Sequence, residues 1–311
     1  NPVWVMLILA VYYSTGLALF GLDLALAAPA GVPAAAPLAL SGVLAQPGTL
    51  RLLVALLMLW PASYYLHAQQ PKKIWRLVWA DEFNYRGLPD SSKWNYDVGS
   101  NNGWGNNELQ YYTEKTKGNA RVENGRLIIE ARRENKDSFH YTSARLVTRG
   151  KASWTSGKIL VRAKLPAGRG TWPAIWMLAE NMKTWPDDGE IDIMEHVGFH
   201  PGYIHASVHC KNYNHIIGTQ KTDTIRVRDF ATAFHVYELE WDAEHIRIGV
   251  DGKWYFSFAN EHKDYASWPF ENKMSLILNI AVGGNWGGQK GVDQKVFPAR
   301  MEIDYVRVFQ Q

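Results

Sequence analysis

The chain has 311 residues, of which 47% are hydrophobic and 20% charged, a balance typical of a globular protein with a sizeable core. Its formal net charge of +3 is mild and comes without a stripe of Lys and Arg, which argues against nucleic acid as a partner. The single cysteine, Cys210, excludes an intrachain disulfide and a cysteine-based zinc cluster.

Residues 1–70 have the composition of a membrane-directed segment, with Asp23 and Arg51 as their only formally charged side chains. Residues 3–22 carry no charge over a length that suffices to span a bilayer. Residues 51–70 resemble a secretory signal peptide, with cleavage expected near Ala68. We therefore expect a secreted or periplasmic protein. Two alternatives remain: residues 1–70 are retained as a membrane anchor, or residues 1–50 are not natural coding sequence.

From residue 71 onward, short runs of alternating apolar and polar residues are separated by Gly, Asn, Asp and Pro. The run at 157–166 alternates as a strand with one buried face, and Asp251-Gly252 between two such runs indicates a β-hairpin. In the closing run 301–309 the apolar face switches near the end. Further strands are expected at 126–134, 203–209, 236–241 and 275–282. The pattern predicts one all-β domain over 71–311, an antiparallel sandwich or barrel.

Three carboxylates stand within six residues in the run GEIDIMEH, which begins at Gly189. On a strand, Glu190 and Asp192 share a face, whereas Glu195 would point the other way. A β-bulge around residues 193–194 would return Glu195 to the face of the other two. Three acids on one face suit acid–base chemistry, and two carboxyls at short spacing suit glycoside hydrolysis with retention. The alternative is a solvated strand face with three incidental acids.

Tryptophans framed by glycine and asparagine surround this run in the sequence. Trp172 and Trp176 are four apart and therefore share one strand face, while Trp104 lies between two glycines beside Asn106. Trp286 stands in the loop GGNWGG. Such rings offer a flat apolar face beside hydrogen-bonding groups, which suits a sugar ring, although a core role for each was the competing interpretation.

GEIDIMEH, together with GRGTWPAIWML, NNGWGNNELQYYT, WADEFN and MEIDYVRVF, resembles glycoside hydrolase family 16, and within it the laminarinase-type endo-β-1,3-glucanases. The similarity covers residues 74–311. It implies a concanavalin-like β-jelly roll of two curved antiparallel sheets, with the substrate in a concave cleft. It also implies Glu190 as nucleophile, Asp192 as its assistant and Glu195 as acid/base, in a retaining double displacement.

The resemblance extends to other residues. It places His209 and Arg145 in the cleft, although a structural histidine and an exposed strand charge are the plainer interpretations. It implies a structural calcium at the residues matching Glu82, Gly125 and Asp304, and no cofactor for catalysis. His196 and His200 could be imagined as metal ligands with Glu195, but no H-E-x-x-H spacing supports this.

The chain departs from the family at Ser156-Gly157-Lys158 and at Leu160, where we expect altered packing or altered contacts at the cleft edge.

The functional expectation is a monomeric endo-hydrolase of β-1,3-glucan whose partner is the polysaccharide itself. Two alternatives are kept. One is the same chemistry on mixed-linkage glucan, agarose or carrageenan, and the other is a non-catalytic glucan-recognition module on the same fold.

Overall fold

The computed structural model describes residues 74–311. The membrane-directed segment predicted at 1–70 lies outside the described residues, so the signal peptide, the anchor and the domain boundary stay predictions. Within residues 74–311, no helix has the length and apolar character needed to cross a membrane.

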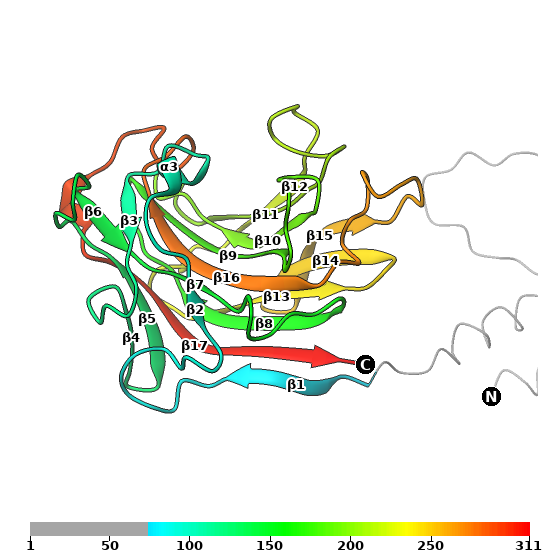
Figure 1. Cartoon of the computed structure of the whole chain (residues 1–311), viewed down its shortest axis with the longest axis horizontal. Helices are drawn as coiled ribbons and strands as arrows, with labels where there is room; N and C mark the ends of the chain where they lie inside the picture. The colour runs from blue at the N-terminus through cyan, green and yellow to red at the C-terminus, as the bar shows by residue number, and fades with distance from the viewer. Residues whose placement is uncertain (1–73) are drawn as a thin grey trace, which may run out of the picture. The chain divides into compact units, whose positions relative to one another are not determined.

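Two curved sheets, antiparallel throughout, form the two layers of the fold (Figure 1). The first has the strand order β15-β14-β13-β8-β17-β5-β4, with β1 also paired to β17. Its strands are β1 (Arg76–Asp81), β4 (Ala120–Glu123), β5 (Arg126–Ala131), β8 (Gly157–Lys164), β13 (His235–Trp241), β14 (His245–Val250), β15 (Lys253–Ala259) and β17 (Ala299–Gln310). The sandwich and its hairpin at Asp251-Gly252 are therefore confirmed.

The second sheet has the order β12-β11-β10-β9-β16-β7-β2 and carries the acidic run. Its strands are β2 (Asn95–Tyr96), β7 (Arg145–Val147), β9 (Thr171–Ala179), β10 (Glu190–Glu195), β11 (Tyr203–His209), β12 (Lys221–Arg226) and β16 (Met274–Val282). A short parallel pair, β3 (Gln110–Tyr112) and β6 (Tyr141–Ser143), the four-residue α3 (Asn101–Trp104) and the 3-10 turn η1 (Gln294–Val296) complete the described elements.

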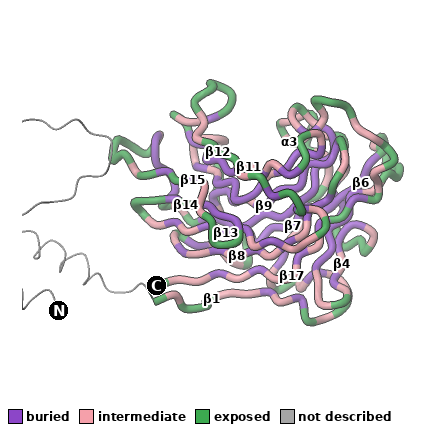
Figure 2. Tube along the Cα trace, turned by 180° about the vertical axis from the view of Figure 1, so that it is seen from behind, coloured by how far each residue is buried: buried purple, intermediate pink, exposed green. Residues whose placement is uncertain are grey.

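Burial follows the sequence patterns from which the strands were predicted. Strand β8 alternates between buried and half-buried residues, because one face packs on the core and the other lies at the surface. Strand β16 is buried throughout, as its almost continuous apolar sequence requires. Figure 2 shows buried residues along the inner strands and exposed residues mainly in the loops. One large apolar core joins the two sheets.

The switch of apolar face near the C-terminus has a local cause. The register between β17 and β8 shifts between Ile303 and Tyr305, so Val306 and Val308 return to the buried face.

The positions at which the chain departs from the family pattern, Ser156-Gly157-Lys158 and Leu160, do not lie in the sheet that carries the acids. Leu160 lies in β8 and pairs with Glu238 and Arg307, in the first sheet. The expectation of altered contacts at the cleft edge was therefore wrong, because β8 and the acidic run lie in different layers.

Candidate active site

A β-bulge lies in β10 at the place that the carboxylate spacing predicts. Against β11, Asp192 pairs with Ser207 and Glu195 with His205, and the register shifts between these two pairs. Against β9 the shift falls between Asp192 and Met194. Ile193 and Met194 are both fully buried in the core, so two successive side chains occupy the inner face. Glu195 thereby shares the outer face with Glu190 and Asp192.

Each of the two glutamates accepts a hydrogen bond from an indole. Trp172 Nε1 donates to Glu195 Oε1 at 2.9 Å, and Trp185 Nε1 donates to Glu190 Oε2 at 2.8 Å. Trp172 comes from β9 and Trp185 from the loop that precedes β10. An N–H donor orients a carboxylate and stabilises its ionised form, so each glutamate is held in place from one side.

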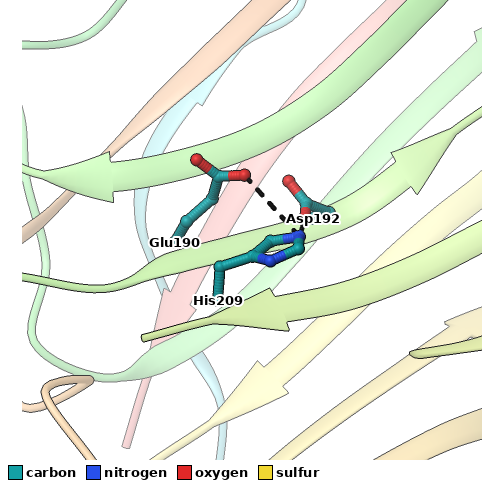
Figure 3. Close-up of side chains that lie close together, drawn as sticks. All are labelled: Glu190, Asp192 and His209. Atoms are coloured by element: carbon teal, nitrogen blue, oxygen red, sulfur yellow. Dashed lines mark ion pairs between the residues drawn. The ribbon is translucent and has the colours of Figure 1, made fainter. Parts of the chain in front are cut away.

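His209 stands beside the first two acids (Figure 3). Its Nε2 lies 3.3 Å from Asp192 Oδ2 and 4.0 Å from Glu190 Oε1. Ligand atoms of these three residues all lie within 4.8 Å of one another, so the group is compact enough to hold a metal ion. His209 is 6% exposed and lies directly beside two of the acids.

All three acids have pKa values raised above their ordinary range. Burial is the main cause for Glu190, whose pKa rises to about 8, and the charge of Asp192 adds to it. Burial also raises the pKa of Glu195 to about 7, against the lowering effect of the Trp172 N–H. The pKa of Asp192 is raised by burial and by the charge of Glu195. Because the carboxyls interact, they titrate as one set and retain protons near neutral pH.

Two aromatic clusters flank the acids. Trp176 and Trp185 pack on Val147, Leu178 and Ile277 beside Glu190. Trp172, Trp286 and Phe199 pack around Val197 and Ala281 beside Glu195. Trp176 and Trp286 remain partly exposed, while Trp172 is 9% exposed. The row of carboxyls thus lies between two apolar surfaces of the kind that sugar rings favour.

Arg145 is not the exposed strand charge that was the plainer interpretation. It is 7% exposed, and its guanidinium lies 4.5 Å from the Trp104 ring centroid and 4.6 Å from that of Trp176. Its Nε lies 3.0 Å from a carboxylate oxygen of Asp97. The cation therefore joins Trp104 and Trp176 into one surface through two cation–π contacts.

Sequence reasoning missed a polar network that supports this surface. Asn279 accepts from Trp176 Nε1 at 2.7 Å and donates to the Tyr112 hydroxyl at 3.0 Å. Tyr112 in turn donates to Glu108, which also accepts from Gln110. The signal was an asparagine inside the apolar run SLILNIAV, because a buried polar residue must have a partner.

Asn106 and Glu108 stand at the edge of the same network. Asn106 donates to Glu108 at a long 3.5 Å, and Glu108 has a pKa raised by burial. The Glu108 charge also acts on Glu195. Asn106 is half-buried and lies near the loop that carries Trp286, because Asn285 N donates to Asn106 O at 2.7 Å.

His196 and His200 do not join the acids. His196 is fully buried against Phe230 and accepts a hydrogen bond from Gly202 N, on the far side of β10 from the carboxyls. The His200 ring stacks on Tyr203 at 3.9 Å between ring centroids. A metal site of these histidines with Glu195 therefore receives no support.

The residues for which the resemblance implies calcium do not present a free anionic donor set. Both carboxylate oxygens of Glu82 accept from Arg307, at 2.7 and 2.8 Å. Asp304 accepts from Arg162 at 2.6 Å, and Gly125 lies in the turn between β4 and β5. Since both carboxylates are neutralised by arginine, these side chains do not fit a calcium site.

A curved sheet that holds buried, proton-retaining carboxyls between aromatic surfaces is an arrangement suited to the hydrolysis of polysaccharides. Comparison with known proteins agrees. The model of glycosyl hydrolases family 16 matches residues 107–307. The chain is 58% identical over 245 residues to the β-glucanase of Rhodothermus marinus, across 76% of this chain and 85% of that protein.

Two solved structures are similar over nearly their whole length. The laminarinase from Rhodothermus marinus has a TM-score of 0.75 and 57% identity, covering 76% of this chain and 98% of that chain. A mutant of SCLam, a non-specific endo-β-1,3(4)-glucanase, was co-crystallised with 1,3-β-D-cellotriosyl-glucose and presents 1,3-β-D-cellobiosyl-glucose at its active site. It has a TM-score of 0.74 and 50% identity, covering 76% of this chain and 95% of that chain. The chain therefore belongs to glycosyl hydrolases family 16. The resemblance read from the motifs and the jelly-roll sandwich it implied are confirmed.

Proposed function

We propose that this chain is a retaining endo-β-1,3-glucanase of the laminarinase type. The observation that carries the proposal is the row of Glu190, Asp192 and Glu195 on one face of β10, with an indole N–H on each glutamate. The similarity to a β-glucanase and to a laminarinase supports the substrate class.

We assign a role to each group from its position and its hydrogen bonds. The carboxyls share protons near neutral pH, and the reactive form is the one in which Glu190 has lost its proton and Glu195 keeps one. In that form Glu190, held by Trp185, attacks the anomeric carbon while Glu195 donates its proton to the glycosidic oxygen. The leaving chain departs, and Glu190 carries a covalent glycosyl ester. Glu195 then takes a proton from water, which attacks the same carbon, releases Glu190 and restores the original configuration. Asp192 and His209 position Glu190 and share its charge. This sequence of proton transfers needs no cofactor.

A second substrate has specific support. SCLam, which resembles this chain at 50% identity, is a non-specific endo-β-1,3(4)-glucanase. Mixed-linkage glucan is therefore a second candidate substrate for the same site. The galactan alternative has less support, since a keratan-sulfate endo-1,4-β-galactosidase is only 31% identical. We also propose that the protein is exported, because a polymeric substrate outside the cell would require an enzyme there.

The test uses the full chain beside two variants, Glu190→Gln and Glu195→Gln. We expect wild type to release short oligosaccharides from laminarin, with the β-configuration retained in the first products. Each substitution lowers kcat by about a hundredfold or more, since it removes the nucleophile or the acid/base. Product analysis and NMR of the newly formed anomer give both results.

Glu244→Gln is the matched control, because Glu244 is exposed and pairs only with His262 among the contacts of the described residues. Its activity should equal that of wild type. Inverted configuration would overturn the double displacement. Turnover of both glutamine variants within a few-fold of wild type would overturn the site. A folded wild type that binds laminarin without cleaving it would favour the recognition module.

A further inference from the structure

Residues 210–219, in the loop between β11 and β12, continue the wall of the site on the side of Glu190. Figure 1 shows this loop projecting above the sheet that carries the acids. The His215 ring lies 5.2 Å from the His209 ring and 5.3 Å from the Trp185 ring. Both of those neighbours contact or approach Glu190. The 210–219 loop is therefore contiguous with the proposed catalytic site.

Hydrogen bonds from one asparagine fix the shape of this loop. Asn214 is 4% exposed, and its Oδ1 accepts from the backbone N–H of Ile216 and Ile217 at 3.1 and 3.3 Å. Its Nδ2 donates to the carbonyls of Cys210 and Lys211, both at 3.1 Å. A loop ordered before a ligand arrives does not lose conformational entropy when it binds.

Contacts to two neighbouring loops hold it further. Lys211 Nζ pairs with Asp187 Oδ2 at 3.2 Å, in the loop that carries Trp185. Asn212 Nδ2 donates to Ser267 Oγ at 2.8 Å, and Asn212 N donates to Ala266 O at 3.0 Å. The three loops thus form one interlocked rim beside Glu190.

The tip of this rigid loop is apolar and faces solvent. Ile216 is 70% exposed and Ile217 is 57% exposed, so neither isoleucine is buried in the core of the domain. His215 beside them has a pKa lowered by partial burial and by His209, which keeps its imidazole neutral. A neutral imidazole next to apolar surface offers both a hydrogen-bond donor or acceptor and a contact for the C–H face of a sugar.

We propose that His215, Ile216 and Ile217 form a distal subsite that binds a further sugar ring of the β-glucan chain occupying the catalytic site. The inference rests on the proposed function, because it names the same polysaccharide as the occupant. The continuity of the loop with Trp185 and His209 argues for that occupant. The distal subsite binds the chain beyond the reacting sugars, so it contributes to affinity for long substrates.

The test compares the full wild-type chain with the double variant Ile216→Ser/Ile217→Ser on β-1,3-linked glucose oligomers of increasing length and on laminarin. For wild type, kcat/KM should rise with length until all subsites are filled. For the double variant the rise should stop earlier, and KM for laminarin should increase about three- to tenfold with little change in kcat. Asn214→Ala keeps both isoleucines but removes the bonds that fix them, and should show the same length-dependent loss.

Ile74→Ser is the control, since Ile74 is equally exposed at 70% but precedes β1 in the other sheet. Thermal unfolding of each variant checks that it is folded. A wild type inactive on every oligomer and on laminarin would overturn the proposed function itself. An active wild type whose length profile matches that of the double variant would overturn the distal subsite and leave the proposed function intact.

Discussion

Each of the two glutamates of the site accepts a hydrogen bond from a different indole N–H group. Trp172 donates to Glu195 and Trp185 donates to Glu190, and each bond favours the ionised form of its acceptor. Burial raises the pKa of both glutamates, to about 7 and about 8, so the indoles act against a larger opposing effect. Removal of one donor should raise the pKa of its acceptor, and the side of the pH profile on which kcat/KM then changes identifies the role of that acceptor.

Trp172→Phe should raise kcat/KM on the alkaline side of the pH–activity profile relative to wild type. Without the N–H, the pKa of Glu195 rises further, so the proton donor stays protonated to higher pH. The measurement is kcat/KM on laminarin across the pH range, with circular dichroism to check folding.

Trp185→Phe should instead lower kcat/KM on the acidic side of the profile relative to wild type. Here the pKa of Glu190 rises, and the nucleophile must lose its proton before it attacks. The two variants control each other because both remove one indole N–H from the same site. The opposite pattern, with Trp172→Phe losing activity on the acidic side and Trp185→Phe gaining it on the alkaline side, would reverse the roles of Glu190 and Glu195.

At the scale of one element, β10 shows how one extra residue changes a strand. A regular strand would bury Glu195 or displace it from Glu190 and Asp192. The bulge instead places Ile193 and Met194 together in the core and returns Glu195 to the outer face. The burial of two apolar side chains offsets the lost ladder pairing at this point.

In strand β16, the buried Asn279 holds the Trp176 ring in place through a hydrogen bond. Asn279→Leu should raise KM for laminarin about three- to tenfold, with a smaller effect on kcat. It removes the acceptor for Trp176 Nε1 and the donor to Tyr112, so the ring beside Arg145 loses its fixed orientation. Steady-state kinetics measure the change.

Tyr96→Phe is the control for this prediction. Tyr96 lies in β2 of the same sheet, and its buried hydroxyl has no hydrogen-bond partner among the described residues. It should leave KM unchanged. If Asn279→Leu lowers the unfolding temperature but keeps the wild-type KM, Asn279 is structural only.

At the scale of the whole molecule, one buried carboxylate joins distant parts of the chain. Glu130 in β5 is fully buried. It pairs with Arg121 of β4, with Arg300 of β17 and with Arg132, which directly follows β5. Strand β17 also connects β1 to β8 across the first sheet. The ion cluster therefore links β17, β5 and β4, which are neighbours at one end of the first sheet.

Glu130→Ala should lower the free energy of unfolding by about 1–3 kcal/mol. This is below the value for fully buried pairs, since the side chains of Arg132 and Arg300 remain 39% and 50% exposed. Urea denaturation measures the change. Glu244→Ala, which removes an exposed pair with His262, should stay within about 0.5 kcal/mol of wild type. Equal stability of both variants would contradict the prediction.

The sequence alone determined the fold class, the bulge and the family, because all three are encoded in local order. Alternation specifies which face of a strand is buried, and the spacing of Glu190, Asp192 and Glu195 requires one inserted residue if they share a face. Trp172 and Trp176 were placed on one face by the same rule.

The tertiary structure decided which distant residues meet. Trp185 was overlooked although it stands five residues before Glu190, because its loop leaves no period from which to infer direction. Arg145 lies between Trp104 and Trp176, and Asn279 binds Trp176, only because β7, β9 and β16 are neighbours in the sheet. Strand order, loop contacts such as His215 with Trp185, and the pKa shifts that follow from burial depend on the packed molecule. Sequence spacing carries no information on them.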